Sequence, residues 1–413
     1  MTTEQPHIPI AKVKPNWDCW GLINLHGDYI IDPIFKNIFD WKDSIARLEK
    51  VSTKIEIGGK WTNHLNGQYG FVNSSGNLIT DFSFGYANDF SCGLAAVCKN
   101  EKWGFINIKG SQQIQFQFDK TSSFQTEGCV VQFDNKFGLI DINGNWKLEN
   151  KFETLSDFSF GLSVASIKEG LFLKKEKKII IDINGNKVVD LPSKWQWFKP
   201  VSEEIILIGT SSGYPGSRTY GFMNLKGEIV TQPQFYTDSD FNFDTGEFSE
   251  GLLAVKNKDQ KNGFVNSNGE ISIELKYDSV ASFRNGISKV SRDGRTFYID
   301  KTGKEIAHKE PIPRERPFDE VLDFSEGLAV ARKGDFWGVI NEVNNVVTGF
   351  KFKKRTYRTQ GDKGLFFSER SPRYSCGLIG VCEEREDNIY SGYIDKQGDI
   401  AIALGFRVAE PFV

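Results

Sequence analysis

Short apolar segments alternate with polar, Gly-containing segments along the whole chain. A typical apolar segment is residues 103–107, Trp-Gly-Phe-Ile-Asn, where an aromatic residue and Gly precede two apolar residues and Asn. Apolar runs of this length, bounded by turn residues, are typical of β-strands. The pattern occurs in ten copies, two of which, ending at Asp182 and Asp300, are weaker because they lack the Gly. The copies end at these residues: Asn24, Asn73, Asn107, Asp141, Asp182, Asn224, Asn266, Asp300, Asn341 and Asp395. The copies lie 34 to 54 residues apart, a spacing typical of propeller blades and related arrays.

A turn is predicted after each of these strands. Gly stands three residues after the Asn or Asp in nine of the ten copies, and Asn344 takes its place after Asn341. This arrangement favours a type I turn closed by a residue with positive φ, a conformation that Asn tolerates best after Gly. The Gly within the strand would let a neighbouring ring or backbone approach closely. Each copy is therefore predicted to be a strand, a tight turn and a second strand.

A second motif, Phe-Ser-x-Gly-Leu, leads into a third strand. It occurs at residues 90–94, 158–162, 248–252 and 324–328. Its Phe would anchor the turn in the core, while Ser and Gly let the chain reverse. Each unit is thus predicted to be an antiparallel meander of at least three strands, and no segment indicates a helix of useful length.

Composition supports the all-β prediction and narrows the classes of function. The 413 residues include 34 Phe, 12 Tyr, 9 Trp and 40 Gly but only 2 Met, which suits many short strands better than a helical core. The formal net charge of −3 argues against general nucleic-acid binding. Six Cys and four His show neither a disulfide framework nor the spacing of a zinc site. The first ten residues lack the features of a secretory signal, so we expect a cytoplasmic protein without metal or cofactor.

These motifs resemble those of a known bacterial family. Residues 103–107 (Trp-Gly-Phe-Ile-Asn) and 324–329 (Phe-Ser-Glu-Gly-Leu-Ala) look like the WG repeat, also called the KWG repeat. The resemblance extends over residues 8–412, with about ten repeats. It implies a binding or scaffold protein with no shared catalytic motif, and it suggests an immunity protein beside a toxin as one possibility. No site residue transfers from the family.

The two ends of the chain suggest how the array is arranged. Residues 409–413 stop near the Phe that precedes a third strand, and residues 8–13 match that missing strand. We therefore expect a single array over residues 1–413, a propeller-like ring closed by the N-terminal strand, which would remove open sheet edges. Ten units exceed the usual four to eight blades, so an open superhelical β-array and two smaller rings are the alternatives.

Insertions suggest where a partner binds. The link between the Gly-Leu-Ala-Val strand and the next aromatic-Gly strand is lengthened at residues 55–68, 209–219 and 383–391. Insertions at one position of a repeat emerge on one face, which is often the binding face. A fourth insertion, residues 351–373, is basic and includes Phe366 and Phe367; such a run can also grip nucleic acid. The candidate binding residues are Trp61, His64, Tyr214, Arg218, Arg355, Tyr357 and Arg358.

The sequence therefore favours a non-enzymatic interaction protein. No P-loop, GxSxG, HExxH or GxGxxG motif at a strand–helix junction is present, and the recurrent Asp residues are explained by the turns. Cys92 and Cys376 share one repeat position, and Cys98 and Cys382 share another, so they do not indicate a thiol site. We expect the partner to be another protein, by family resemblance a toxin, with no membrane or metal involved. The alternatives are a carbohydrate or small-molecule binder, since aromatic residues can stack on sugar rings, and a propeller hydrolase. For the insertions themselves, the alternative to a binding face is that they are neutral.

Overall fold

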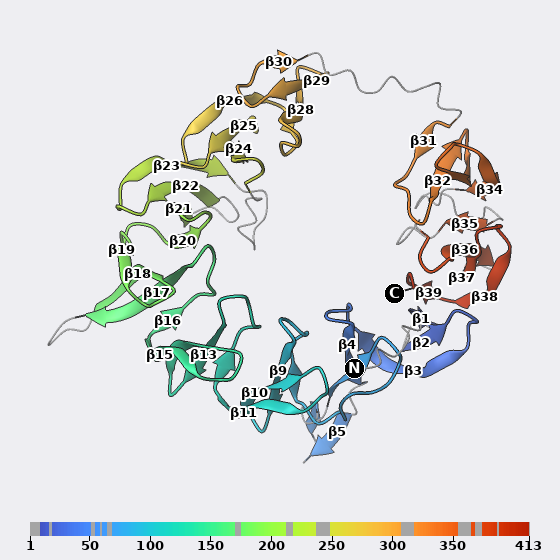
Figure 1. Ribbon diagram of the computed structural model, residues 1–413, viewed down its shortest axis with the longest axis horizontal. Coiled ribbons are helices and arrows are strands. Elements are labelled where there is room, and N and C mark those ends of the chain that lie inside the picture. The colour runs from blue at the N-terminus through green and yellow to red at the C-terminus, as the bar shows by residue number, and fades with distance from the viewer. Residues whose placement is uncertain are drawn as a thin grey trace, which may run out of the picture. The chain divides into compact units, whose positions relative to one another are not determined.

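The computed structural model describes residues 9–15, 19–50, 54–57, 60–63, 68–169, 175–211, 218–236, 248–306, 318–353, 365–367, 374–385 and 388–412. All described elements are β-strands, as the sequence predicts, and these residues contain no helix that could span a membrane. The chain divides into two compact units, each described by itself: unit 1 is Met1–Gln117 with Pro313–Val413, and unit 2 is Phe118–Ile312. Figure 1 labels the strands and colours them along the chain. The single array over residues 1–413 stays a prediction.

An antiparallel sheet of four strands is the basic element. It is clearest in β8 (Tyr86–Ala87), β9 (Leu94–Lys99), β10 (Lys102–Asn107) and β11 (Gln112–Phe118), which pair in chain order. The last three are the strands that the sequence predicts. The short β8 is an addition, because two residues are too few to show a periodic pattern.

The remaining sheets repeat this order with small variations. Unit 2 contains β12 (Lys120–Thr121), β13 (Cys129–Phe133), β14 (Lys136–Ile140), β15 (Trp146–Phe152), β16 (Thr154–Leu155), β17 (Leu162–Glu169), β18 (Lys175–Asp182), β19 (Lys187–Asp190), β20 (Trp197–Pro200), β21 (Ile205–Ser211), β22 (Arg218–Asn224), β23 (Ile229–Tyr236), β24 (Leu252–Lys256), β25 (Asn262–Asn266), β26 (Ile271–Tyr277), β27 (Ser279–Val280), β28 (Ile287–Arg292), β29 (Arg295–Asp300) and β30 (Glu305–Ile306). They form the sheets β12–β15, β16–β19, β20–β23, β24–β26 and β27–β30.

Unit 1 adds three sheets to that of β8–β11. Its other strands are β1 (Ile10–Lys14), β2 (Trp20–Asn24), β3 (Tyr29–Ile38), β4 (Ile45–Lys50), β5 (Lys54–Ile57), β6 (Lys60–Asn63), β7 (Tyr69–Asn73), β31 (Glu320–Val321), β32 (Leu328–Lys333), β33 (Phe336–Asn341), β34 (Val346–Lys353), β35 (Leu365–Phe367), β36 (Ile379–Arg385), β37 (Asn388–Ile394), β38 (Ile400–Phe406) and β39 (Val408–Ala409). The sheets are β39-β1-β2-β3-β4-β7, β31–β38 and the hairpin β5-β6.

The N-terminal strand joins the C-terminal strand within unit 1. β1 pairs with β39, where Val13 faces Ala409, and on its other edge with β2. It thus stands between a short strand and an aromatic-Gly strand, as β9 does in its own sheet. Lys12 of β1 is buried, and its Nζ lies 2.6 Å from a carboxylate oxygen of Glu410. The predicted pairing of the two ends is present, whereas closure of the whole array into a ring stays a prediction.

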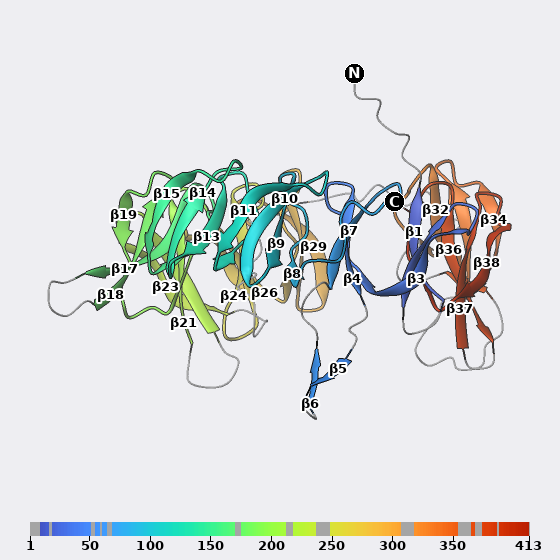
Figure 2. The same cartoon turned by 90° about the horizontal axis from the view of Figure 1, so that it is seen from below.

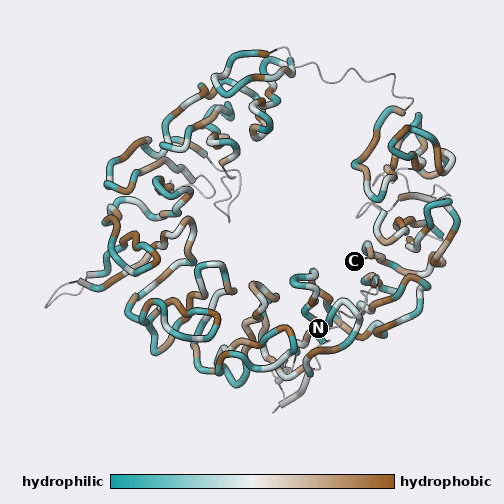
Figure 3. The backbone as a smooth tube through the Cα atoms, viewed as in Figure 1, coloured by the Kyte–Doolittle hydropathy of each residue, from teal (hydrophilic) through white to brown (hydrophobic). Residues whose placement is uncertain are grey.

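The core lies between neighbouring sheets. In unit 1 the buried rings of Phe71 in β7 and Phe90 before β9 pack edge to face, with centroids 5.1 Å apart. The same cluster contains Val97 and Ile106 of the β8–β11 sheet. Figure 3 shows hydrophobic segments recurring between polar ones along the tube. Phe90 and Phe158 of the Phe-Ser motif therefore anchor their turns in the core, as predicted, whereas Phe324 is 43% exposed.

The Gly of the aromatic-Gly strand permits a close approach of two backbones. A Cβ atom on Gly104 would lie 2.8 Å from the carbonyl oxygen of Ile114, and one on Gly221 would lie 2.2 Å from that of Thr231. Both separations are shorter than a Cβ atom tolerates, and the strand register shifts around Gly221. The prediction of a close approach at this Gly is confirmed, with the backbone as the neighbour.

The predicted turn is present at all ten Asx positions. In each, the side-chain Oδ1 accepts the N–H groups two and four residues further on, and the main-chain carbonyl accepts the N–H three residues on. Asn344 adopts a φ of 62° in place of Gly. The Asx residues therefore have a structural role.

Three of the predicted loop insertions consist largely of hairpins. Residues 55–68 contain most of β5 and all of β6, residues 209–219 join β21 to β22, and residues 383–391 join β36 to β37. Backbone pairing extends these hairpins, so the predicted loops are shorter than expected. Each insertion occupies the second link of its sheet, as predicted.

The prediction of one continuous loop over residues 351–373 is wrong. β34 continues to Lys353, and β35 forms within the segment. Phe367 of β35 is buried, and its ring centroid lies 4.4 Å from that of Phe352. Phe367 is therefore a core residue, because this segment supplies the first strand of the next repeat.

Candidate binding site at an interrupted row of turns

The seven predicted binding residues do not form a described site. Trp61 lies in β6 and Arg218 at the start of β22, and only the backbone of these two residues is described. The other five lie outside the described residues: His64, Tyr214, Arg355, Tyr357 and Arg358. Their role in binding stays a prediction, and a different part of the repeat shows a defined site.

The turns of the Phe-Ser motif, here called Phe-Ser turns, are tight two-residue hairpins. In one of them the Ser91 N–H donates to the Leu94 carbonyl at 2.9 Å, and the Leu94 N–H donates back at 3.2 Å. Cys92 and Gly93 between them have positive φ values of 54° and 76°. This is the type I′ geometry, which matches the twist of the flanking strands. The same geometry occurs at residues 43–44, 160–161, 250–251, 285–286, 326–327 and 376–377.

The Ser hydroxyl of a Phe-Ser turn connects one sheet to the next. Ser249 Oγ donates to the carbonyl oxygen of Phe283, the aromatic residue that opens the following turn, at 2.6 Å. The bond recurs in unit 1 between Ser325 and Tyr374 at 2.8 Å and between Ser375 and Phe412 at 2.6 Å. We call this contact the Ser link.

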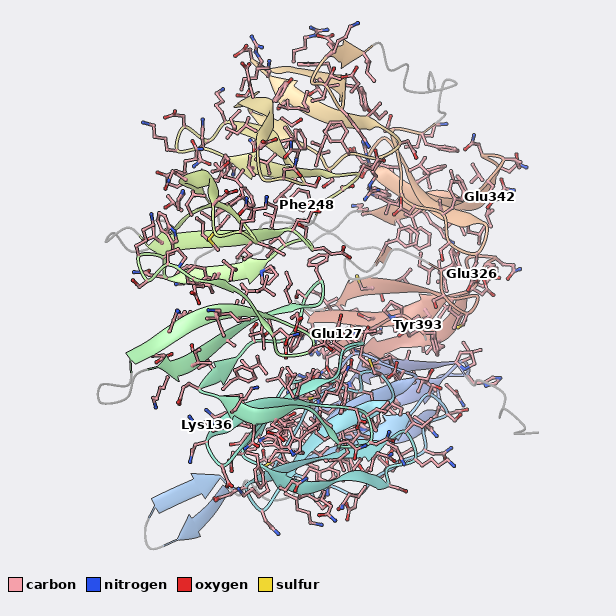
Figure 4. All side chains as sticks on the ribbon, turned by 60° about the vertical axis from the view of Figure 1, so that its left-hand side comes forward. Glu127, Lys136, Phe248, Glu326, Glu342 and Tyr393 are labelled. Atoms are coloured by element: carbon pink, nitrogen blue, oxygen red, sulfur yellow. The ribbon has the colours of Figure 1, made fainter. Side chains whose placement is uncertain are left out.

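An acidic residue at the variable position of the turn makes a second contact, which we call the Glu link. Glu250 Oε2 accepts the N–H of Gly286 in the next Phe-Ser turn at 2.9 Å and lies 3.1 Å from Lys301 Nζ in the next Asx turn. The hydrogen bonds from Lys301 and Gly286 hold the pKa of Glu250 below its usual value. Glu326, labelled in Figure 4, makes the same two contacts to the sheet that follows it.

Both links are interrupted in unit 2. Phe160 occupies the acidic position of its turn, so that turn has no carboxylate for a Glu link. The next turn has Glu204 where other turns have Gly, and its Ser202 Oγ accepts the N–H groups of Glu204 and Ile205 at 3.2 and 3.1 Å. Within the described part of the chain, neither Ser159 nor Ser202 donates to a carbonyl of the next sheet. The Ser link and the Glu link that Ser249 and Glu250 make are therefore missing at these two successive turns, and Gln125 and Arg284 take the place of the Ser in two further turns.

A cavity of about 590 Å³ lies at this interruption, and we call it the Phe160 cavity. Its described lining consists of Ser159, Phe160, Lys199, Pro200, Val201, Ser202, Phe248 and Ser267. Val201 and Phe248, the latter labelled in Figure 4, also pack against a buried apolar cluster of unit 2, so one side of the cavity is continuous with the core. The volume lies in the range of sites for small ligands or single side chains of a partner.

Phe160 has a conformation and an exposure that are unfavourable for its residue type. Its φ is 55°, and 56% of the residue is exposed. A residue other than Gly in this left-handed region costs roughly 1–2 kcal/mol, and the exposed ring contributes little hydrophobic stabilisation. The fold does not demand Phe here, because Glu, Asn and Cys adopt the same conformation in other turns. An unfavourable residue without a structural reason is a candidate for function.

The Phe160 cavity and the predicted insertions lie at opposite ends of their sheets. Successive links of an antiparallel meander alternate between its two ends. In each sheet the Phe-Ser turn connects the first two strands and the Asx turn connects the last two, so both turns lie at the same end of the sheet. At that end Lys301 pairs with Glu250. The insertions lie in the connection between the second and third strands, at the other end of the sheet. Figure 2 shows β5 and β6 projecting from unit 1 on the side to which β37 extends. The sequence analysis considered the insertion end and missed this site.

A signal for this site was present in the sequence. Phe160 and Glu204 replace the acidic residue and the Gly of other copies, so an alignment of the repeats against each other would expose both. Around them, the described lining offers aromatic rings, hydroxyl groups and one ammonium group. Among the described residues, no group of three or more His, Cys, Asp or Glu side chains could hold a metal ion. The side chains at the cavity are suited to binding.

Comparison with known proteins supports the repeat found in the sequence. The family model described as "WG containing repeat" matches residues 20–50, 69–103, 103–136, 220–261, 263–295 and 318–335. No curated protein matches the chain. Among solved structures, a eukaryotic initiation factor is similar with a TM-score of 0.33 and 10% identity, over 95% of each chain. Hydrazine synthase of Kuenenia stuttgartiensis is similar with a TM-score of 0.27 and 10% identity, over 63% of this chain and 93% of that chain.

Proposed function

Because the chain is a WG-repeat protein, we propose that it is a non-enzymatic scaffold that binds another protein at the Phe160 cavity. The observation that carries the proposal is the exposed ring of Phe160, held in a left-handed turn beside the cavity. Aromatic residues next to a desolvated pocket are typical anchors of protein interfaces. By family resemblance, a toxin is the first partner to test.

The surroundings of Phe160 favour a preformed site over an adaptable loop. The two-residue turn fixes the backbone at Phe160, and the strands on either side, β16 and β17, pair in register. A rigid anchor loses less conformational entropy on binding than a mobile one does. Pro200 and Val201 extend the apolar surface beside the ring, so a partner side chain inserted there would be desolvated.

Affinity capture with matched variants tests this function. We would compare the wild type with Phe160→Glu, which restores the acidic residue of other turns, and with Ile142→Glu, which removes a 48% exposed apolar residue from an Asx turn of unit 2. A partner that is captured by the wild type and by Ile142→Glu, but not by Phe160→Glu, supports the proposal. Loss of capture in a Trp61→Ala/Tyr214→Ala variant, with normal capture by Phe160→Glu, would place binding at the insertion end instead.

A carbohydrate or another small molecule is the second candidate ligand. The cavity combines the rings of Phe160 and Phe248 with the hydroxyl groups of Ser159, Ser202 and Ser267. Rings can pack against the C–H faces of a sugar while hydroxyl groups bind its oxygens. A rise in melting temperature with one member of a glycan or metabolite panel, absent in Phe160→Glu, would favour this function.

A further inference from the structure

The Phe160 cavity lies where two Ser links are not formed. In a formed link, Ser249 Oγ donates to the carbonyl oxygen of Phe283 in the next sheet at 2.6 Å. The residues at the corresponding positions of the cavity are Ser159 with Val201, and Ser202 with Phe248. Within the described part of the chain, neither Ser hydroxyl donates to a carbonyl of the next sheet. Each unformed link therefore leaves a hydroxyl group on one sheet and a carbonyl group on the next.

The hydroxyl groups at these positions can donate. Ser202 Oγ uses its lone pairs to accept the N–H groups of Glu204 and Ile205 at 3.2 and 3.1 Å, which leaves its O–H hydrogen for an acceptor. Ser159 Oγ makes no hydrogen bond to a described residue. A ligand that supplies an acceptor to the hydroxyl and a donor to the carbonyl would bridge either link.

This requirement favours an uncharged group. A carboxylate only accepts hydrogen bonds and an ammonium group only donates them, so each would satisfy one side of an unformed link. An amide group satisfies both sides, because its carbonyl accepts and its N–H donates. Lys199 also lines the cavity but already has an interaction within the chain, so it gives no reason to expect a charged ligand.

The apolar lining defines the rest of the ligand. Val201 and Phe248 continue into a buried apolar cluster, which suits an apolar side chain better than a sugar ring surrounded by hydroxyl groups. We infer that the partner inserts an uncharged peptide segment, whose amide groups bridge the unformed Ser links while an adjacent apolar side chain packs against Phe160 and Phe248. This inference rests on the proposed function and specifies the chemistry of the partner.

Three probes that share an N-acetylphenylalanyl group separate these contributions. Saturation-transfer NMR would compare N-acetylphenylalaninamide, N-acetylphenylalanine methyl ester and N-acetylphenylalanine on the full chain, with methyl glucoside as a carbohydrate probe. We expect the amide to bind best and the ester, which lacks the terminal N–H donor, to bind roughly three- to tenfold more weakly. A similar loss is expected when the amide is tested on Ser159→Ala, which removes the hydroxyl group of one unformed link.

Ser325→Ala is the matched control, because it removes the Ser of a formed link in unit 1. It should lower the melting temperature and leave binding of the amide unchanged. Ser159→Ala should show the opposite behaviour, with weaker binding and the melting temperature of the wild type. Phe160→Glu should abolish the signal of the amide, and Ile142→Glu should preserve it.

The outcomes distinguish the two proposals. Equal binding of the amide and the ester, stronger binding of the free acid, no signal from any probe or no effect of Ser159→Ala would overturn this inference. If a protein partner is still captured through Phe160, the proposed function survives each of these results. Binding of methyl glucoside alone would overturn the inference in favour of a carbohydrate. If neither probes nor protein depend on Phe160, both proposals are wrong.

Discussion

At the residue scale, Gly392 in β37 shows why the aromatic-Gly position excludes a side chain. A Cβ atom there would lie 2.6 Å from the carbonyl oxygen of Ile402. We expect Gly392→Ala to force β37 and β38 apart and to lower the free energy of unfolding by about 1–3 kcal/mol, measured by calorimetry. Gly405→Ala in β38 is the control, because no heavy atom lies within 4 Å of its Cβ position. Equal melting temperatures of the two variants would contradict the steric explanation.

The Asp residues of three Asx turns should make unit 2 sensitive to acid. Burial works to raise the pKa of Asp141 and Asp182, but hydrogen bonds from turn N–H groups and Asn side chains outweigh it and lower both pKa values. The hydrogen bond from Thr302 is the main cause of the lowered pKa of Asp300. A carboxyl group with a lowered pKa stabilises the fold above its unfolded pKa of about 3.9. That contribution is lost as the pH falls through the folded pKa.

The triple variant Asp141→Asn/Asp182→Asn/Asp300→Asn tests this linkage. Asn accepts the same N–H groups in the other copies, so we expect the variant to melt like the wild type near neutral pH. Below about pH 4 the wild type should lose stability faster than the variant, because the variant has no carboxyl group to protonate in these three turns. Melting temperatures measured across the pH range would show the two curves separating. Parallel curves would mean that these carboxyl groups titrate alike in the folded and unfolded chains.

At the element scale, the interrupted row of turns can be repaired. The double variant Phe160→Glu/Glu204→Gly supplies the acid and the Gly N–H that form a Glu link in other turns. Glu250 and Glu326 adopt the required positive φ, so the substitution introduces no conformation foreign to this turn. We expect a melting temperature at or above that of the wild type, together with loss of partner binding. A repaired chain that still binds its partner would show that the interruption is not the site.

Local patterns explain which elements could be predicted. Strands and Asx turns follow from residues close in sequence, so their positions are read correctly. The extended hairpins of β21–β22 and β36–β37 could not be predicted, because backbone pairing forms strands from polar segments that have no apolar pattern. Phe367 is similarly misplaced, since only the packing against Phe352 shows that its segment starts a repeat. The role of Phe160 depends on links between sheets, which a single copy of the repeat does not contain.

At the scale of the whole molecule, β1 is expected to hold the two ends of unit 1 together. Its Ile10 and Val13 are completely buried, and each such side chain stabilises the fold by roughly 1.5–3 kcal/mol. Its backbone pairs with both β2 and β39, so a chain without residues 1–15 would expose two strand edges. We expect that deletion to lower the melting temperature of unit 1 by several degrees and to promote association of chains.

A deletion of residues 1–8 is the matched control, because it shortens the chain but leaves β1 intact. A synthetic peptide of residues 9–15 should restore the melting temperature of the longer deletion in a concentration-dependent manner, since it can pair between β2 and β39. Static light scattering would show whether adding the peptide also abolishes the association of chains. If the two deletions melt alike, the pairing of β1 with β39 contributes little stability, and the fold of unit 1 must rest on the packing between its other sheets.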